Sequence, residues 1–466
     1  MFTRQHAAFS GHSAVDYAET LCYNTPTWVS KEAWQMLTGN IQRNESGELC
    51  FAGQTVRSLA EEYGTPLYLM DEDRIRSNCR MYRDAFQESF GEGSLSLYAS
   101  KAASFKQICR IVAEEGLGID TVSRGEIHTA LSAGFPAEKI YFHGDGKTEE
   151  DIRYALNARI GCFVVDNETE LECLQREAKA QGIRQKVLLR ITPGIDPHTY
   201  EAVNTGTVDV KFGVPIADGQ AQHFVEKALS MDVINVSGLH CHVGSMVFDE
   251  MVFEDTVDHM VCFLKELHDA LGFTAEELNL GGGYGVRYLE TDKTVDIPAR
   301  IRALAEHIRQ RVAEAGLSMP LILMEPGRSI VADAGMTVYT VSTVKHLAGL
   351  KNYVIVDGGM ADNPRYCLYQ APYTVLPVSN AEGQEEVFDL VGRCCESGDI
   401  IQPGVKLPAD IRHGDLVAVC TTGAYNYSMA SNYNRLGRPP VVMLQGGKHY
   451  VAVRRETLED LCALDV

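Results

Sequence analysis

The sequence predicts an α/β fold with an added β domain: a (β/α)8 barrel of the TIM type, followed by an antiparallel β domain. Short apolar runs recur at fairly even intervals through the first 335 residues, and segments with helical spacing separate several of them. After about residue 335 the pattern changes to short strand-like runs separated by turn residues. Strands that alternate with helices form parallel βαβ units, and eight such units close into a barrel. An open, doubly wound sheet is the competing arrangement.

The apolar runs of the first part are the predicted barrel strands. They are residues 95–100, 118–123, 139–144, 161–166, 186–191, 236–244, 278–283 and 321–327. Many of the segments between them end at glycine, which is a common C-terminal cap of a helix. The order of strand, helix and glycine therefore favours repeated βα units.

The same pattern divides the chain into four predicted parts. They are an N-terminal extension (1–37), strands that contribute to the β domain (38–70), the (β/α)8 barrel (71–335) and the C-terminal β domain (336–466). Within the last part, Gly446 and Gly447 lie between two apolar runs, which indicates a β-hairpin. Because strand-like pieces also precede the barrel, the β domain is expected to combine two separate stretches of sequence.

Composition argues against several classes of protein. The 466 residues include 42 Lys and Arg against 63 Asp and Glu, and the net charge of −21 argues against a nucleic-acid partner. A small anionic substrate would then need local cationic groups. No run of about 18 apolar residues predicts a membrane span, and the N-terminus lacks a secretory pattern, so we expect a cytoplasmic enzyme. Thirteen cysteines without a CxxC pair favour free thiols in a reducing compartment over a zinc site.

Residues suited to chemistry follow the predicted strands, at the edge where barrel enzymes bind their substrates. Lys101 directly follows the first run, in LSLYASKA. It could be a solvated lysine at the end of a strand. It could also form a Schiff base, in which case its surroundings must lower its pKa so that the neutral amine can attack a carbonyl.

Two further groups follow the seventh and eighth runs. Gly281, Gly282 and Gly283 would let backbone N–H groups approach an anion, and barrels commonly bind phosphate at this place. Glu325 ends the apolar run LILME, where a buried carboxylate needs a partner. That partner could be Arg328 in a structural ion pair, or the ring nitrogen of a pyridine-type cofactor, which the carboxylate would keep protonated.

His240 and His242 lie on one predicted strand with a single residue between them, so both point to the same face. A metal pair is conceivable, but no further ligands stand at a telling spacing, and we predict no metal site. One histidine is expected in the core with its hydrogen bonds satisfied. The other could stack on a planar cofactor.

Six motifs together resemble a known family. YASKA, HVGS, GGG, EPGR, CESGD and GAY follow one another between residues 98 and 425. They are similar to the fold-type III decarboxylases that depend on pyridoxal 5′-phosphate (PLP), whose barrel is of the alanine-racemase type. The likeness is greatest to the members that act on diaminopimelate. It implies PLP as the cofactor and the conversion of meso-2,6-diaminopimelate to L-lysine and CO2, the last step of lysine biosynthesis.

The resemblance also implies a role for each matching residue. The catalytic residues would be Lys101, which carries the cofactor as a Schiff base, His242, which stacks on its ring, and Cys395. Glu325 would bind the ring nitrogen. Further cofactor contacts would come from Ser245, Gly281, Gly282, Gly283, Gly327, Arg328 and Tyr425. The substrate would be bound by Arg328, Arg365, Tyr369, Glu396 and Tyr425. Cys395 would donate a proton after CO2 leaves, and in this family it comes from the neighbouring subunit of a homodimer.

The distal end of the substrate gives a physical reason for two of these residues. Diaminopimelate carries a second carboxylate and a second ammonium group, which suit Arg365 and Glu396 respectively. Ornithine and lysine have no distal carboxylate for Arg365 to bind. The arginine therefore favours diaminopimelate among the substrates of the family.

Three alternatives stay open. One is an alanine-racemase-like enzyme, although such enzymes typically place an arginine at the ring nitrogen, unlike Glu325. Another is a decarboxylase of ornithine, arginine or carboxynorspermidine, against which Arg365 and the CESGD motif argue. The third is a catalytically silent homologue that regulates a partner, but such a protein need not retain Lys101, Glu325 and Cys395.

Overall fold

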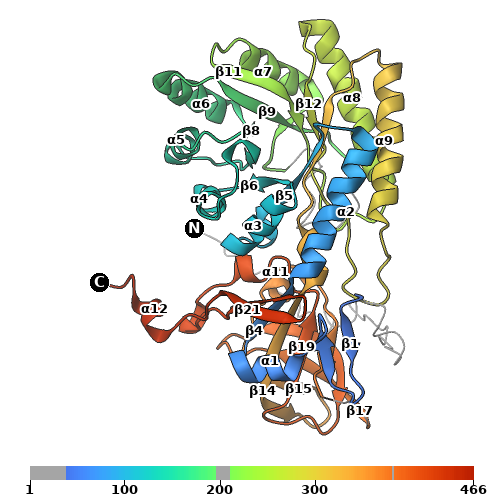
Figure 1. The fold of residues 1–466 in the computed structure, drawn as a ribbon, viewed down its shortest axis with the longest axis vertical. Helices are drawn as coiled ribbons and strands as arrows, with labels where there is room; N and C mark the ends of the chain where they lie inside the picture. The colour runs from blue at the N-terminus through green and yellow to red at the C-terminus, as the bar shows by residue number, and fades with distance from the viewer. Residues whose placement is uncertain (1–37, 196–209, 380–382) are drawn as a thin grey trace, which may run out of the picture.

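The computed structural model describes residues 38–195, 210–379 and 383–466, which form a barrel and a β-sheet domain (Figure 1). The expected N-terminal extension, residues 1–37, lies outside the described residues. In Figure 1 the barrel occupies the upper part of the view and the β domain the lower part. Among the described helices, none is both long and apolar enough to cross a membrane.

The barrel is a closed ring of parallel strands, and each strand overlaps one of the runs predicted from the sequence. Its strands are β5 (Leu95–Ala99), β6 (Gly118–Thr121), β7 (Ile140–Phe142), β8 (Cys162–Val165), β9 (Gln185–Thr192), β11 (Ile234–His240), β12 (Glu277–Asn279) and β13 (Leu321–Met324). Neighbouring strands pair in parallel, and β8 pairs with β9, which closes the ring. The closure confirms the predicted barrel and excludes an open, doubly wound sheet. A short strand, β10 (Val214–Pro215), extends the pairing at the end of β9.

A ring of helices covers the outside of the barrel (Figure 1). These helices are α2 (Glu72–Phe90), α3 (Lys106–Glu114), α4 (Arg124–Ser132), α5 (Glu149–Asn157), α6 (Glu168–Gln181), α7 (Gln220–Leu229), α8 (Met251–Leu271) and α9 (Ile297–Glu314). Helix α2 precedes the first barrel strand yet packs beside α9, so it fills the last place in the ring. Side chains cap the starts of several of these helices: Asp71 accepts from Arg74 N at α2, and Thr148 and Asp151 form a capping box at α5.

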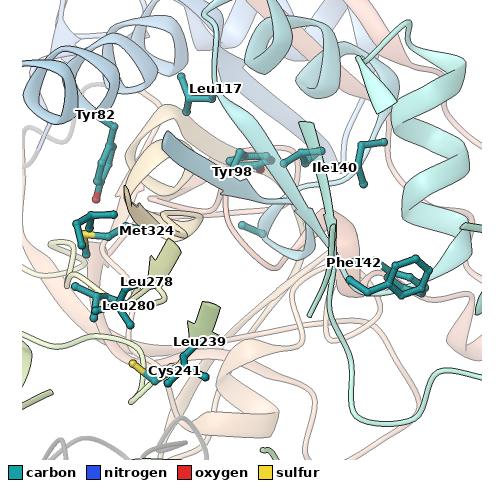
Figure 2. Close-up of a cluster of buried hydrophobic side chains, with 14 of the residues drawn as sticks. Tyr82, Tyr98, Leu117, Ile140, Phe142, Leu239, Cys241, Leu278, Leu280 and Met324 are labelled. Atoms are coloured by element: carbon teal, nitrogen blue, oxygen red, sulfur yellow. The ribbon is translucent and has the colours of Figure 1, made fainter. Parts of the chain in front are cut away.

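Side chains of the barrel strands alternate between the barrel interior and the helix layer, as the two-residue period of a strand requires. The interior holds Leu97, Tyr141, Cys162, Val164, Leu188 and Leu323. Figure 2 shows part of the outer layer, with Tyr98, Ile140 and Met324 on strands and Tyr82 on α2. Both layers are buried and close-packed, so they fix the positions of the strand ends that carry the site.

The β domain contains a mixed sheet of nine strands in the described residues. The strands are β4 (Leu67–Asp71), β14 (Gly335–His346), β15 (Asn352–Val356), β16 (Val375–Pro377), β17 (Glu385–Val391), β18 (Ile400–Pro408), β19 (Leu416–Cys420), β20 (Val441–Gln445) and β21 (Lys448–Val453). Strands β20 and β21 form the hairpin predicted at Gly446 and Gly447. Most pairings are antiparallel as expected, but β15 pairs with β17 and β4 with β20 in parallel. Long connections separate the members of both parallel pairs, as parallel pairing requires.

Strand β4 comes from the stretch before the barrel and lies between β14 and β20. It leads directly into α2, while β14 follows the end of the barrel. The chain thus crosses between barrel and sheet at neighbouring places, which holds the β domain against one rim of the barrel. The other strands of the stretch 38–70 are β1 (Ile41–Arg43), β2 (Leu49–Phe51) and β3 (Gln54–Thr55). They form a separate small sheet that packs on the large one together with α1 (Val56–Tyr63).

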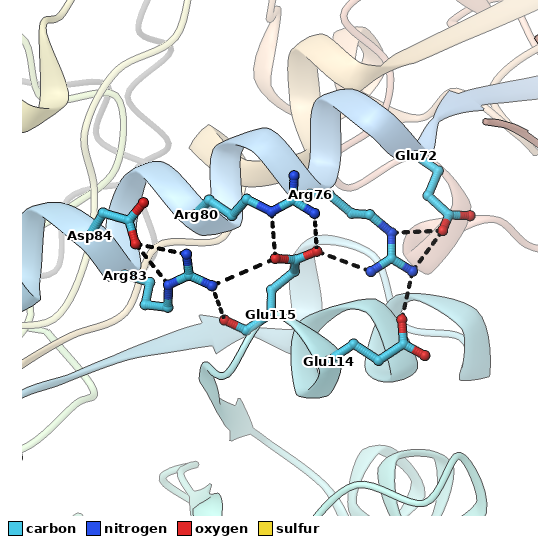
Figure 3. Close-up of polar contacts among 7 residues, drawn as sticks. All are labelled: Glu72, Arg76, Arg80, Arg83, Asp84, Glu114 and Glu115. Atoms are coloured by element: carbon cyan, nitrogen blue, oxygen red, sulfur yellow. Dashed lines mark hydrogen bonds and ion pairs between the residues drawn. The ribbon is translucent and has the colours of Figure 1, made fainter. Parts of the chain in front are cut away.

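A group of ion pairs joins α2 to the residues that end α3 (Figure 3). The Glu115 side chain is 6% exposed, and its carboxylate accepts from Arg80 Nε at 2.8 Å and from Arg76 Nη1 at 3.1 Å. Arg83 lies 3.8 Å from the same carboxylate. Burial alone would raise the pKa of Glu115, but Arg80 and Arg76 outweigh burial and lower the pKa below its ordinary value. The ionised carboxylate therefore stabilises the folded protein.

Replacing Glu115 with Gln should lower the midpoint of thermal unfolding by about 3 °C at pH 7, because the arginines lose a largely buried partner. Since the folded-state pKa of Glu115 is depressed, its contribution is present above the ordinary pKa of 4.5 and is lost as the pH falls through the folded-state pKa. Calorimetry at pH 7 and at acidic pH measures both effects.

The matched control is Glu114→Gln. The Glu114 carboxylate contacts Arg76 at 2.6 Å, but its side chain is 57% exposed, so the variant should shift the midpoint by less than about 1 °C. Equal shifts for the two variants would contradict the assignment of the stabilisation to the buried carboxylate.

Candidate active site

A pocket of about 920 Å³ lies where the C-terminal ends of the barrel strands face the β domain. From the barrel side it is lined by polar and charged residues that include Lys101, Asp120, His143, Arg190, His240, His242, Ser245, Tyr288, Glu325 and Arg328. The β domain contributes Arg365, Tyr369 and Tyr425. A cavity of this size, in which a few charged groups converge, is the usual form of a small-molecule site.

Lys101 enters the pocket from a single 3-10 turn, η2 (Ser100–Ala102), which directly follows β5. Burial lowers the pKa of Lys101, but Tyr425 and the carboxylates of Asp120 and Glu325 outweigh burial and raise the pKa above its ordinary value. The expectation that the surroundings lower the pKa of this lysine is therefore wrong. The physical reason is that Tyr425 and two carboxylates face the amine.

Glu325 follows β13 and is held by side chains from three other strands. Asn279, the last residue of β12, donates to Glu325 Oε1 at 2.6 Å, and His240 Nε2, at the end of β11, lies 3.2 Å from Oε2. His143 Nε2, just beyond β7, lies 2.9 Å from Oε1. Burial lowers the pKa of His240 to about 4, so its neutral ring can donate to the carboxylate. Burial opposes ionisation of Glu325, but its histidine partners hold its pKa well below the ordinary value.

His143, His240 and Glu325 also have the composition of a metal site, because their ligand atoms lie within 4.8 Å of one another. The same atoms already contact each other, since His240 Nε2 hydrogen-bonds the carboxylate and His143 Nε2 lies 2.9 Å from it. We therefore interpret the group as a buried, hydrogen-bonded carboxylate rather than a metal centre.

His242 lies two residues beyond β11, against the glycine loop that follows β12. The backbone N–H of Gly282 donates to His242 Nδ1 at 3.3 Å. The close packing requires glycine, because an added Cβ at Gly282 would lie 2.1 Å from the backbone oxygen of Glu325, and one at Gly281 would lie 2.7 Å from the His242 ring. Burial, and then the charge of Lys101, lowers the pKa of His242 well below its ordinary value. The imidazole is thus a neutral, flat surface in the pocket.

Arg328 begins the short helix α10 (Arg328–Val331), directly after Gly327. Its Nη2 donates to Ser245 Oγ at 3.1 Å, and its Nη1 donates to Tyr288 Oη at 2.9 Å. The guanidinium also packs on the ring of Tyr425, with Cζ 4.7 Å from the ring centroid. Among the described residues these partners hold Arg328, and the structural ion pair with Glu325 that the sequence left open is not formed.

The β domain supplies a second arginine. Arg365 begins helix α11 (Arg365–Tyr369) and is 5% exposed. Its Nη1 donates to Tyr373 Oη at 2.8 Å, and its guanidinium lies over the ring of Tyr288 with Cζ 4.8 Å from the centroid. Tyr369, at the other end of α11, also lines the pocket. Two arginines from different parts of the fold therefore reach one cavity.

Tyr425 ties the β domain to the turn that carries Lys101. Its backbone N–H donates to Ala102 O at 2.7 Å. Its φ angle of 65° is uncommon for a residue with a side chain, and such strained residues concentrate at binding sites. The contact places the Tyr425 ring beside both Lys101 and Arg328.

The structure brings most of the predicted site residues together. Those that line the pocket are Lys101, His242, Ser245, Glu325, Arg328, Arg365, Tyr369 and Tyr425. Gly281, Gly282, Gly283 and Gly327 lie beside it, packed against His242, Glu325, Gly244 and Ala99. Cys395 and Glu396 do not line it, because they are exposed on the loop between β17 and β18. The resemblance assigned Cys395 to the site of a neighbouring subunit.

Sequence reasoning missed Asp120, His143, Arg190, Asn279 and Tyr288. Asp120, His143 and Arg190 each lie within one of the predicted apolar runs, GIDTVS, KIYFHG and KVLLRI. A charged or titratable residue inside a buried strand is the signal that could have identified them. Tyr288 has no such signal, because it lies in a loop and only the fold places it beside Arg328.

Comparison with known proteins gives the family. Residues 72–332, more than half of the chain, match the family model for the pyridoxal-dependent decarboxylase, pyridoxal binding domain. The diaminopimelate decarboxylase of Bacillus subtilis (strain 168) is 43% identical over 431 residues, which are 92% of this chain and 98% of that protein. The chain belongs to the diaminopimelate decarboxylase family. The Mycobacterium tuberculosis (strain ATCC 25618 / H37Rv) diaminopimelate decarboxylase is 41% identical, with coverage of 92% and 97%.

Solved structures agree with this assignment. The diaminopimelate decarboxylase of M. jannaschii, in complex with L-lysine, has a TM-score of 0.85 and 34% identity, and the match covers 92% of this chain and 98% of that one. The lysine/ornithine decarboxylase of Vibrio vulnificus, in complex with cadaverine, has a TM-score of 0.70 and 25% identity, with coverage of 84% and 97%. Of these two structures, the diaminopimelate decarboxylase is the more similar.

The pocket of this diaminopimelate decarboxylase family member suits PLP. Ser245 offers a hydroxyl for a phosphate, and the glycine loop beside it leaves backbone N–H groups accessible to an anion. The ionised carboxylate of Glu325 suits a protonated ring nitrogen, and the neutral face of His242 suits a flat ring. The amine of Lys101 suits an aldehyde. The donor set therefore matches each part of the cofactor.

Replacing Asp120 with Asn should speed the attachment of PLP to the cofactor-free protein by about fivefold at pH 8. Removal of one carboxylate that raises the pKa of Lys101 lowers this pKa, so a larger fraction of the amine is neutral. In both proteins the rate should rise with pH until the pH passes the raised pKa of Lys101. The growth of visible absorbance after mixing measures the rate.

Asp145→Asn is the matched control for Asp120→Asn. Asp145 also lines the pocket, but its carboxylate pairs with Lys211 at 3.1 Å and so does not act mainly on Lys101. Attachment that is unchanged or slower in Asp120→Asn, or equally fast in both variants, would contradict the origin assigned to the raised pKa.

Proposed function

We propose that this chain catalyses the PLP-dependent decarboxylation of meso-2,6-diaminopimelate to L-lysine and CO2, the last step of lysine biosynthesis. The observation that carries the proposal is the content of one pocket. Lys101 and the ionised Glu325 line it together with two buried arginines, Arg328 and Arg365. Diaminopimelate has a carboxylate at each end, so one can be lost while the other is bound by arginine. The similar enzymes of Bacillus subtilis and Mycobacterium tuberculosis act on the same substrate according to their names.

The residues around the ring would prepare it for carbon–carbon bond cleavage. PLP supplies the electron sink that stabilises the negative charge left on Cα when CO2 departs. Glu325 would hold a proton at the ring nitrogen, because its carboxylate is ionised and already fixed by its hydrogen bonds. The neutral ring of His242 would pack on the flat face, and Ser245 with the glycine loop would bind the phosphate.

Other residues would orient the substrate and move its protons. Arg328, Arg365 and Tyr369 would bind the distal carboxylate, which leaves the reacting end beside Lys101. The Lys101 amine would give up its covalent position when substrate enters and regain it when L-lysine leaves. Cys395 would then have to supply the proton to Cα, and Glu396 would bind the distal ammonium.

Cys395 and Glu396 would perform these roles in the pocket of a second copy, which makes the active unit a homodimer with shared sites. Both residues are exposed, yet their loop is fixed. The backbone N–H of Cys395 donates to the Asn434 side chain at 2.7 Å, and that of Cys394 donates to the buried Asp399 carboxylate at 2.7 Å. A fixed, exposed loop is suited to completing a site on another subunit.

The proposal extends to the organisation of the chain and its location. We propose residues 71–335 as the cofactor-binding domain, residues 38–70 and 336–466 as the β domain, and residues 1–37 as an extension. The cysteines of the described residues are free thiols, as expected for an enzyme of the reducing cytoplasm.

Purified, PLP-loaded protein should release CO2 from meso-diaminopimelate at least about 100-fold faster than from ornithine, arginine or lysine at equal concentration, because only the first has a distal carboxylate for the arginines. The Lys101→Ala variant should lose both the visible absorbance band and the activity. Release from ornithine without release from diaminopimelate would show that the substrate is wrong, and a band that survives in Lys101→Ala would show that the cofactor anchor is wrong.

Mixing two inactive variants tests the shared site. Equal amounts of Lys101→Ala and Cys395→Ala protein are mixed and allowed to exchange subunits. About half of the resulting dimers contain one subunit of each variant, and each such dimer holds one intact site of its two. The mixture should therefore regain about a quarter of wild-type activity. The CO2 assay on diaminopimelate measures the recovery.

The matched control mixes Lys101→Ala with Glu325→Gln. Lys101 and Glu325 line the same pocket of one chain, so exchange cannot assemble an intact site and activity should not return. Recovery in the control, or none in the first mixture, would contradict the placement of Cys395 in the neighbouring subunit's site.

A further inference from the structure

Tyr288 lies between Arg328 and Arg365, two of the arginines that line the pocket, and none of the six motifs includes it. It belongs to the loop after β12 and is 3% exposed. Its hydroxyl accepts from Arg328 Nη1 at 2.9 Å, and the guanidinium of Arg365 lies over its ring with Cζ 4.8 Å from the centroid. Since Arg328 comes from the barrel and Arg365 from the β domain, Tyr288 contacts both sides of the pocket.

The position of Tyr288 is fixed by its backbone as well as by the arginines. The Thr374 hydroxyl, from the β domain, donates to Tyr288 O at 2.8 Å. The carboxylate of Asp292 accepts from Tyr288 N at 2.8 Å and from Leu289 N at 2.9 Å. The ring therefore has a defined place from which to orient other side chains.

Two guanidinium groups that share one buried wall repel each other, and an acceptor between them offsets part of this repulsion. Burial raises the pKa of the Tyr288 hydroxyl, but Arg328 and Arg365 outweigh burial and lower the pKa below its ordinary value. The two arginines thus favour negative charge on this oxygen, one through a hydrogen bond and the other through its charge beside the ring. Tyr373 accepts from Arg365 on another side and in turn donates to the Asn426 side chain at 3.1 Å.

We propose that Tyr288 is a positioning residue for substrate recognition: its hydroxyl holds Arg328 beside Arg365, which packs on its ring, so that the two arginines form a pair that binds the carboxylate at the far end of the substrate. The inference rests on the proposed function, because it needs a substrate with a distal carboxylate. Arginines that are arranged in advance lose less side-chain freedom when the carboxylate binds, so the benefit appears in affinity for that group. Ligands without the carboxylate gain nothing from it.

L-Lysine and cadaverine differ by this one carboxylate, which makes them matched probes. In PLP-loaded Tyr288→Phe, the Kd of L-lysine should rise about tenfold, while the Kd of cadaverine changes less than about twofold, by calorimetric titration. The KM for diaminopimelate should rise by a similar factor, while kcat stays within about threefold of wild type, since the removed contact acts on binding of the distal group in ground and transition states alike.

Tyr284→Phe is the matched control. Tyr284 lies on the same loop and is 5% exposed, but its ring packs on Phe253 at 4.5 Å and does not line this pocket. This variant should bind both ligands as wild type does. Equal weakening of L-lysine and cadaverine in Tyr288→Phe would show a merely structural role, and an unchanged ratio of the two Kd values would overturn the inference.

The same set of measurements separates the inference from the proposed function. Wild-type protein that releases no CO2 from diaminopimelate overturns the proposed function and the inference that rests on it. Wild-type protein that is active, together with Tyr288→Phe in which the ratio of the two Kd values is unchanged, overturns only the role of Tyr288.

Discussion

The buried carboxylate of Glu325 is the constraint on which the rest of the site depends. An ionised carboxylate removed from water costs several kcal/mol unless polar partners compensate for lost hydration. Its partners come from the ends of β12 and β11 and from just beyond β7, and β7 lies across the barrel from β13. Only a closed barrel brings these strand ends together. The charge at the site therefore depends on the closure of the ring.

The same carboxylate sets the protonation of its surroundings. His240 and His242 are both held neutral by burial, so neither cancels the charge of Glu325. Lys101 faces Glu325 and Asp120, and their charges raise its pKa although burial opposes this. A lysine that forms a Schiff base usually has a lowered pKa, but in this pocket Lys101 is held as a cation beside the two carboxylates. Binding of an aldehyde at Lys101 must displace a proton that the carboxylates favour.

The sequence predicts the features that repeat along the chain or interrupt a pattern. The strand runs, Lys101 and Glu325 could be found because alternation of strands and helices fixes a barrel, and because a charge next to an apolar run is unusual. The parallel pairing of β4 with β20 could not be predicted, because the order of strands in a sheet depends on packing between segments that are far apart in sequence. The role of Tyr288 could not be predicted for the same reason. It depends on contacts with Arg328 and Arg365, which come from two different domains.

Glu325 also bears on the type of reaction. A carboxylate whose pKa is held well below its ordinary value keeps a proton on a facing ring nitrogen, and a protonated ring withdraws electrons strongly. An arginine at this place would leave the nitrogen unprotonated and the ring a weaker acceptor, as in the racemase alternative. Loss of CO2 leaves a full pair of electrons on Cα, so it benefits most from the stronger acceptor. His240 and Asn279 support this arrangement through their hydrogen bonds to the carboxylate.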